Sequence, residues 1–397
     1  MYSEDDINSA VEAGAMSADA AAGLRMHIAK LRELPRGSEE SFKLINSFND
    51  IFVAIGIVIL LVAVGAIGQA IAGQFVTVPP YPFENWDWAN GSPPDDDAAM
   101  AAWNAARQLN DALQTCLAGL LVAVIAWPLS EFFTLKRRMA LPSILLLLAF
   151  VGGVFFTVFG AGMALALDGS DTAGALMISA AALVAAGAAL LHWRRFMVPI
   201  TVAAGAAAIA STVIALILAA IGPDTINENV VFALVFVAGL GVWAFAMRWD
   251  MSDRERITRR SDVAFWLHLL AAPMIAHPIF ALLGVTEGDN LGIAAAVGVL
   301  AVYVAFGLVA LAIDRRALLV SALAYVLFAL TFLFREFGAV ELGFALTALV
   351  IGSALLSLSA FWQPIRRAVV SGLPDNLQSK LPATEDQPLA APVQSAA

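Results

Sequence analysis

Uninterrupted apolar runs dominate the hydropathy pattern of the chain, and the first of them extends from Asp50 to Ala72. It carries no charged side chain for about 20 residues after Asp50, the length at which a helix crosses ~30 Å of hydrocarbon. The later runs are also continuous rather than alternating, so they predict helices and not the strands of a membrane barrel. The predicted spans are 50–72, 112–133, 141–167, 172–193, 196–221, 230–247, 263–284, 291–313, 317–334 and 339–361.

The composition supports lipid as the solvent for most of the surface. Of the 397 residues, 60% are hydrophobic and 14% are charged, whereas soluble domains carry about 25% charged residues. We therefore predict an all-α fold, a polytopic transmembrane helical bundle of about ten spans with the lipid bilayer as its main partner. No basic domain is present that would favour nucleic acid as a partner.

Basic residues are sorted by their position along the chain. With ten spans, 20 of the 22 Lys and Arg residues fall on one side of the membrane, and only Arg107 and Arg335 fall on the other. The positive-inside rule then places both termini in the cytoplasm, which predicts a multi-pass protein of a bacterial inner membrane. A missed or additional span would break this alternation, so the alternation independently supports the number of spans.

The chain divides into three predicted parts. Residues 1–49 form a small cytoplasmic helical hairpin, residues 50–367 form the ten-span domain, and residues 368–397 form a disordered cytoplasmic tail. The tail contains several prolines and few large apolar residues, a composition that does not supply a packed core.

Capping residues define the predicted hairpin. Ser3 and Ser17 are positioned to cap two helices, and Gly14 and Pro35 are positioned to end them. Apolar residues four apart on each helix give the hairpin a thin apolar seam. The two helices are expected at about 4–13 and 18–34.

The predicted outer segment at 73–110 contains a further helix start. Ser92-Pro93-Pro94-Asp95 places prolines and acidic residues in a first helical turn, where each is favourable. We expect this helix to run directly into the second span.

The seventh span is the richest in candidate functional groups. It holds His268 and His277, together with Pro273 and Pro278. Each proline removes a helix hydrogen bond, and a broken helix at mid-depth is how many transporters build a substrate or proton site. The two rings are expected to point to opposite faces, because nine residues rotate a helix by about 900°. The alternative is that each His bonds a neighbouring helix.

Ionisable residues near span ends supply the other candidates for a substrate or proton-relay site. Glu131 lies near the inner end of the second span, where pairing with Lys136 or Arg137 is the alternative to a proton site. At the outer end of the ninth and tenth spans lie three further residues, for which an ion pair closing a tight turn is the alternative. These three are Arg335, Glu336 and Glu341.

Several motifs are absent from the sequence. It contains no phosphate-binding Gly-x-x-x-x-Gly-Lys-[Ser/Thr] loop, no His-Glu-x-x-His zinc motif and no Gly-x-Ser-x-Gly elbow. Cys116 is the only cysteine, so an internal disulfide is excluded. We therefore predict no cofactor, no bound metal and no catalytic residue.

The N-terminal region resembles a known group of proteins. The matching residues are Ile7-Asn8, Ala13-Gly14-Ala15-Met16-Ser17, Ala20-Ala21, Leu24 and Phe48-Asn49-Asp50-Ile51-Phe52. In these residues and in its general layout the chain is similar to uncharacterised bacterial predicted-membrane-protein families, domains of unknown function that join a short N-terminal helical hairpin to eight or more spans. The resemblance covers about the first 75 residues and implies no activity or site residue.

Two functions remain open from the sequence. The first is a secondary transporter or permease for a small solute, which predicts a water-accessible pathway near Pro273 and His277. The second is a non-enzymatic membrane scaffold or regulatory protein that binds a cytoplasmic protein partner through its N-terminal hairpin, which predicts a dry, tightly packed bundle. The number of spans favours transport, whereas the expected scarcity of buried charge favours a scaffold. Of the two, the sequence predicts transport, with the scaffold as the alternative. An intramembrane enzyme is a more distant third.

Overall fold

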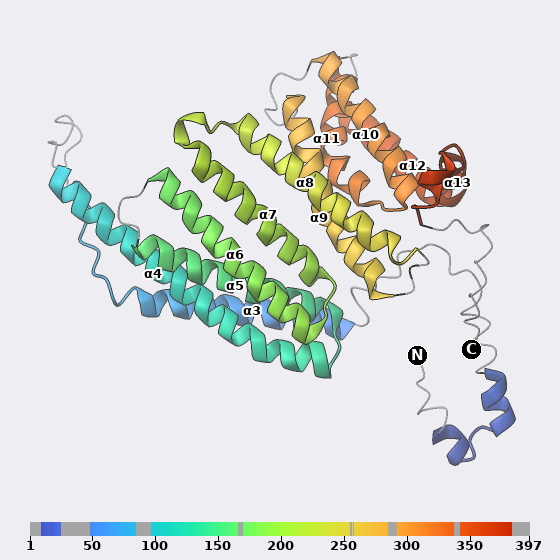
Figure 1. Cartoon of the computed structure of the whole chain (residues 1–397), viewed down its shortest axis with the longest axis horizontal. Coiled ribbons are helices and arrows are strands. Elements are labelled where there is room, and N and C mark those ends of the chain that lie inside the picture. Colours follow the sequence, from blue (N-terminus) through green and yellow to red (C-terminus); the bar gives the residue numbers. More distant parts are fainter. Residues whose placement is uncertain are drawn as a thin grey trace. The chain divides into compact units, whose positions relative to one another are not determined.

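The computed structural model describes residues 9–24, 48–84, 97–165, 170–254, 256, 258–284, 292–336 and 342–382 (Figure 1). Throughout these ranges the regular secondary structure is helical, which confirms the predicted all-α class. Two compact units are distinguished, one of residues 1–42 with 383–397 and one of residues 43–382.

The larger unit is a sequence of apolar helices joined mostly by short turns. Within the described residues, nine helices are long and apolar enough to cross a membrane, or ten if a bent pair near the C-terminus counts as one span. The first group comprises α3 (Phe48–Ala72), α4 (Asp97–Ser130) with the π-helix η2 (Glu131–Lys136), α5 (Ala140–Leu165), α6 (Asp171–Phe196) and α7 (Ile200–Ile221).

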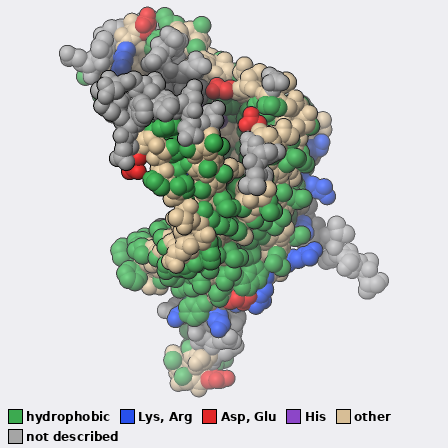
Figure 2. Space-filling model, turned by 90° about the vertical axis from the view of Figure 1, so that its left-hand side faces the viewer, with side chains coloured by type: hydrophobic (Ala, Val, Ile, Leu, Met, Phe, Trp, Pro, Cys, Tyr) green, Lys and Arg blue, Asp and Glu red, His purple; other side chains and the backbone are tan. Residues whose placement is uncertain are grey.

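The second group begins after the short 3₁₀ helix η3 (Pro223–Thr225). It comprises α8 (Glu228–Met251), α9 (Arg259–Leu282), α10 (Ile293–Ile313), α11 (Ala317–Glu336), α12 (Gly343–Ala360), α13 (Trp362–Ser371) and α14 (Asp375–Gln378). Each of the ten predicted spans overlaps one of the helices α3 to α12, and α12 qualifies as a span only together with α13. Figure 2 shows the broad hydrophobic surface that such helices present, with Lys and Arg side chains mostly along one edge of the apolar surface in that view.

The second span is longer than its apolar core. Helix α4 begins at Asp97 and continues without interruption to Ser130, as the acidic helix start in the outer segment predicted. The rings of Tyr81 and Trp103 pack edge to face with centroids 5.1 Å apart, and this contact ties the preceding segment to α4.

The last apolar helix ends in a sharp bend. Helices α12 and α13 meet at 73° around Phe361. The buried residues of α13 are Trp362, Arg366 and Val370, which are four apart and therefore share one helix face. The structured part of the chain consequently extends to Pro382, where Leu381 is buried, instead of ending at 367 as the predicted tail requires.

Close backbone contacts join the early helices. A Cβ added at Gly160 of α5 would lie 2.5 Å from the backbone nitrogen of Cys116 in α4. One added at Gly119 of α4 would lie 2.7 Å from the carbonyl oxygen of Gly153 in α5. Small residues allow helix backbones to approach in this way, since van der Waals packing drives association in lipid.

The described part of the smaller unit is residues 9–24, which form two short helical pieces. Gly14 ends the first piece with φ of +68°, and the Ser17 hydroxyl accepts a hydrogen bond of 3.1 Å from the backbone N–H of Ala20. The predicted stop at Gly14 and cap at Ser17 are therefore confirmed. The caps and helix ends predicted at Ser3 and Pro35 lie outside the described residues.

We expect Gly160→Leu to lower the free energy of unfolding by about 1–3 kcal/mol, because the new side chain would collide with the α4 backbone. Thermal unfolding of the purified protein in detergent would measure the change. Gly152→Leu is the matched control on α5, since a Cβ there meets nothing within 4 Å. Equal stability of the two variants would contradict the close α4–α5 contact.

Candidate functional site: a buried charge cluster at the basic end of the bundle

Helix α9 carries the residues that the sequence favoured for transport, and it is continuous. It runs from Arg259 to Leu282 through Pro273 and Pro278, so the predicted broken helix is wrong. Each proline removes only one hydrogen bond, whereas α9 packs against α7, α8 and α11 along its length. Its fully buried side chains hold the helix in place; they include Leu267, Ala271, Ala272, Ala276 and Phe280.

The two histidines of α9 do not share a site. His268 is buried, and its Nδ1 lies 2.8 Å from the carbonyl oxygen of Ala264 in the same helix and 3.7 Å from Asp250 Oδ2 of α8. His277 is exposed, and its Nδ1 forms a hydrogen bond with the Tyr325 hydroxyl of α11. The alternative prediction, a bond to a neighbouring helix, is confirmed for His277. Among the described residues, no group of three His, Cys, Asp or Glu side chains could hold a metal ion.

Glu131 lies in the π-helix η2 and forms an ion pair with α6. Arg195 donates two hydrogen bonds to its carboxylate, of 2.8 Å and 2.7 Å. The predicted partners Lys136 and Arg137 are therefore wrong. The bidentate fork of Arg195 gives a stronger contact, and the Arg137 guanidinium instead lies 5.5 Å from the ring centroid of Phe132.

The remaining candidates are at the end of α11. Arg335 and Glu336 are both exposed there, and Glu341 lies outside the described residues. The ion pair predicted for this turn has no counterpart among the described side chains. The Cγ of Arg335 would touch a Cβ placed on Gly343 at 3.4 Å, so the Arg335 stem packs at the start of α12.

A cluster of buried charges lies where the sequence placed only surface arginines. We call this end of the bundle, where α8 and α10 end and α9 and α11 begin, the basic end. Arg315 donates hydrogen bonds of 2.6 Å and 3.3 Å to the carboxylate of Asp250, and a third of 3.1 Å to the carbonyl oxygen of Ser261. Arg315 and Asp250 are each only 2% exposed.

Asp314 is the second centre of the cluster. Its carboxylate accepts hydrogen bonds of 2.9 Å from Arg256 and 2.7 Å from the indole N–H of Trp362, and Arg366 Nε lies 3.8 Å away. Asp314 itself has φ of +56°, a conformation that Asp tolerates better than most residues. This residue therefore joins the α8–α9 loop, the α10–α11 turn and α13.

The loop between α8 and α9 is held by a third carboxylate. Asp253 Oδ2 accepts hydrogen bonds from the backbone N–H and the hydroxyl of Thr258, at 3.0 Å and 2.7 Å. Two arginines also hold the C-terminal segment. Arg254 donates to the carbonyl oxygen of Leu381 at 2.9 Å, and Arg366 donates to that of Pro382 at 2.8 Å.

The cluster balances its charge. The aspartates at 250, 253 and 314 offset the arginines at 256, 315 and 366, and five of the six are at most 7% exposed. Burial and the charge of Arg315 lower the pKa of Arg256, whereas Asp314 and Asp250 oppose the shift. An arginine side chain is effectively always protonated in proteins, so Arg256 keeps its positive charge.

This arrangement fixes the basic end but offers no open reacting group. Each carboxylate is engaged by N–H or O–H donors, so none is presented to water as a proton acceptor. The expected scarcity of buried charge is therefore wrong. The signal in the sequence is the presence of three acidic residues among the arginines of the basic side, namely Asp250, Asp253 and Asp314.

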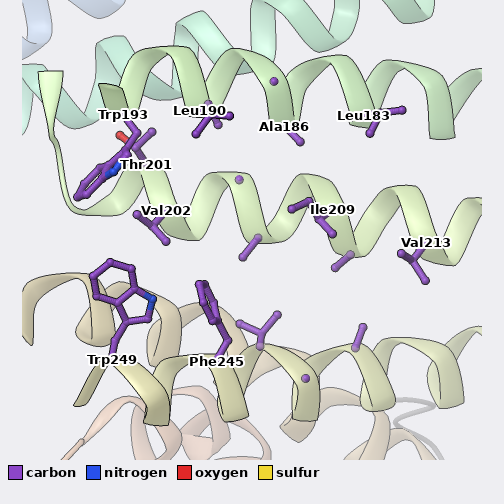
Figure 3. Close-up of a pocket in the computed structure, with 18 residues that line it drawn as sticks. Leu183, Ala186, Leu190, Trp193, Thr201, Val202, Ile209, Val213, Phe245 and Trp249 are labelled. Carbon is purple, nitrogen blue, oxygen red and sulfur yellow. The ribbon is translucent and has the colours of Figure 1, made fainter. Parts of the chain in front are cut away.

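An apolar groove lies apart from this cluster, between α6, α7 and α8 (Figure 3). Its volume is about 760 Å³, within the range of about 300–1,000 Å³ typical of small-molecule sites. Apart from the Thr201 hydroxyl and the indoles of Trp193 and Trp249, its lining side chains carry no polar atom. A groove of this kind cannot form a hydrated pathway for a polar solute.

Comparisons with protein families, with curated proteins and with solved structures found no match to this chain. The resemblance of its N-terminal region to uncharacterised membrane-protein families stays a prediction.

We expect Asp250→Asn to reduce stability by ~3–5 kcal/mol, because it leaves the buried Arg315 charge without its counter-ion. The matched control is Glu131→Gln, which breaks an ion pair whose side chains are 52% and 33% exposed and should change the melting temperature little. Thermal unfolding of both variants in detergent would compare them. Similar small changes in both would show that the buried cluster does not stabilise the fold.

Proposed function

We propose that the protein is a non-enzymatic membrane scaffold or regulatory protein that binds a cytoplasmic protein partner through its N-terminal helical segment. The observation that supports this most is that α9 is an unbroken and closely packed helix. The helix is continuous, its buried face packs closely, and its histidines contact protein groups. A scaffold needs such a dry and rigid bundle, whereas a transporter needs a hydrated route.

The proposal includes an orientation and a location. The basic end faces the cytoplasm of a bacterium, as the positive-inside rule requires, and the bundle lies in the inner membrane. Both termini then share the compartment of the partner. Most described side chains at 9–24 are exposed, although Ala21 is buried and Ala10, Val11, Met16 and Leu24 are partly buried. This segment therefore has surface available for binding.

A secondary transporter is the second candidate, and one observation favours it. Pro273 and His277 are both exposed on α9, and they share a face because they are four residues apart. Pro273 frees a backbone carbonyl near this face. A conformational change that admits water there would create the polar site that the present structure lacks.

Thiol labelling separates the two functions. The variant carries Cys116→Ala and His277→Cys, and a membrane-impermeant maleimide is applied to intact cells and to inverted vesicles. We expect no labelling from either face, because a thiolate must reach water to react. Gln74→Cys, at an exposed position in the predicted outer segment, is the positive control in cells. Labelling of position 277 from either face would overturn the scaffold and support transport.

A further inference from the structure

The groove between α6, α7 and α8 has a defined direction. Trp193, Thr201 and Trp249 lie at one end, and Leu183 and Val213 lie at the other (Figure 3). Leu183 and Trp193 are separated by about 15 Å along α6, at 1.5 Å per residue. The groove therefore runs along the helices and suits an extended occupant.

The groove exists because its helices pack mainly on other partners. Helix α7 packs closely on α6 and helix α8 packs closely on α9, whereas α7 and α8 touch little. Two glycines that line the groove also leave space in it. A Cβ added at Gly187 of α6 or at Gly241 of α8 would meet nothing within 4 Å, and both residues are exposed.

The chemistry of the walls selects a hydrocarbon occupant. The lining residues are almost all aliphatic or aromatic, and the Thr201 hydroxyl already faces His192 Nδ1 at 3.4 Å. An apolar cavity does not hold ordered water, because a water needs two or more polar partners. The groove lies among membrane-spanning helices, where acyl chains are the surrounding solvent.

Two arginines are adjacent in sequence to the tryptophans at this end of the groove, although neither arginine lines the groove itself. Arg194 follows Trp193 on α6, and Arg248 precedes Trp249 on α8. Both arginines are exposed, and neither forms an ion pair with a described residue, in contrast to Arg195, which binds Glu131. A guanidinium binds phosphate through bidentate hydrogen bonds, and the Trp rings suit the layer between headgroup and hydrocarbon.

We propose that this groove is a binding site for an anionic phospholipid, with an acyl chain between α6, α7 and α8 and the phosphate between Arg194 and Arg248. A second copy of the chain fits less well. In the same membrane orientation it would bring its own basic helix ends to the same depth, and like charges would then oppose the contact. The site gives the scaffold a means of responding to lipid composition.

Photo-crosslinking of the full chain tests the proposal. The probe is phosphatidylglycerol with a diazirine on its acyl chain, and the matched neutral probe is phosphatidylcholine with the same chain, each in phosphatidylcholine vesicles. We expect the anionic probe to label peptides 183–213 and 238–249 more strongly. Removing Arg194 and Arg248 as Arg194→Ser and Arg248→Ser should lower this labelling by about 5-fold for each arginine, the ratio for one Arg near an anionic surface.

Substitutions that fill the groove provide a second, independent test of the proposal. The pair Gly187→Leu and Gly241→Leu should lower labelling by both probes, because both positions line the groove and an added Cβ at either meets no protein atom within 4 Å. Gly56→Leu is the control, an exposed glycine of α3 that is not among the groove residues and has nothing within 4 Å of an added Cβ. It should leave labelling unchanged.

Three results would overturn the proposal. They are equal labelling by the two probes, labelling that is spread over all spans, and labelling that survives the paired leucine substitutions. Disulfide crosslinking between two chains that carry Ile209→Cys in the Cys116→Ala background would instead identify a second copy as the occupant, because Ile209 lines the groove.

Discussion

A charge buried in an apolar bundle is unfavourable unless a counter-ion and hydrogen-bond donors accompany it. Arg315 meets this condition through Asp250 of α8 and the Ser261 carbonyl of α9. Because these groups come from separate helices, the pair can form only when α8, α9 and the start of α11 are assembled together. The rest of the second helix group is arranged around this requirement.

The same constraint extends to the C-terminal segment. Asp314, next to Arg315, binds Arg256 of the α8–α9 loop and Trp362 of α13. The bend of 73° after α12 places α13 where Trp362 and Arg366 can reach that carboxylate. In this arrangement paired charges close the basic end, and an apolar groove lies beside α7. The closed polar end and the apolar groove are the two features on which the proposed scaffold role and the proposed lipid site rest.

The sequence predicted the parts of this fold that depend on local composition. Spans follow from continuous apolar runs, because lipid requires each segment to satisfy its own backbone hydrogen bonds. The stop at Gly14 and the cap at Ser17 follow from the conformational preferences of single residues. The extension of α4 back to Asp97 follows from the acidic first turn.

The sequence could not predict which charges are buried, because that depends on partners far apart in the chain. Asp250 and Arg315 are separated by 65 positions, and Glu131 and Arg195 by 64. The rule that places arginines on the cytoplasmic side describes Arg315 and a surface arginine equally well. The prediction of a broken helix at Pro273 and Pro278 is wrong for a related reason. Packing against three neighbouring helices keeps α9 continuous.

The central claim is that the buried charge cluster holds the basic end of the bundle together. Hydrogen exchange at the basic end, in the full chain reconstituted in lipid, tests this most directly. The backbone N–H of Thr258 bonds to Asp253, and that of Arg315 bonds to the carbonyl of Ala310. We predict that these two amides exchange as slowly as those in the buried helices, and that Asp250→Asn speeds the exchange of both. Exchange at the rate of exposed loops in the unaltered protein would contradict it.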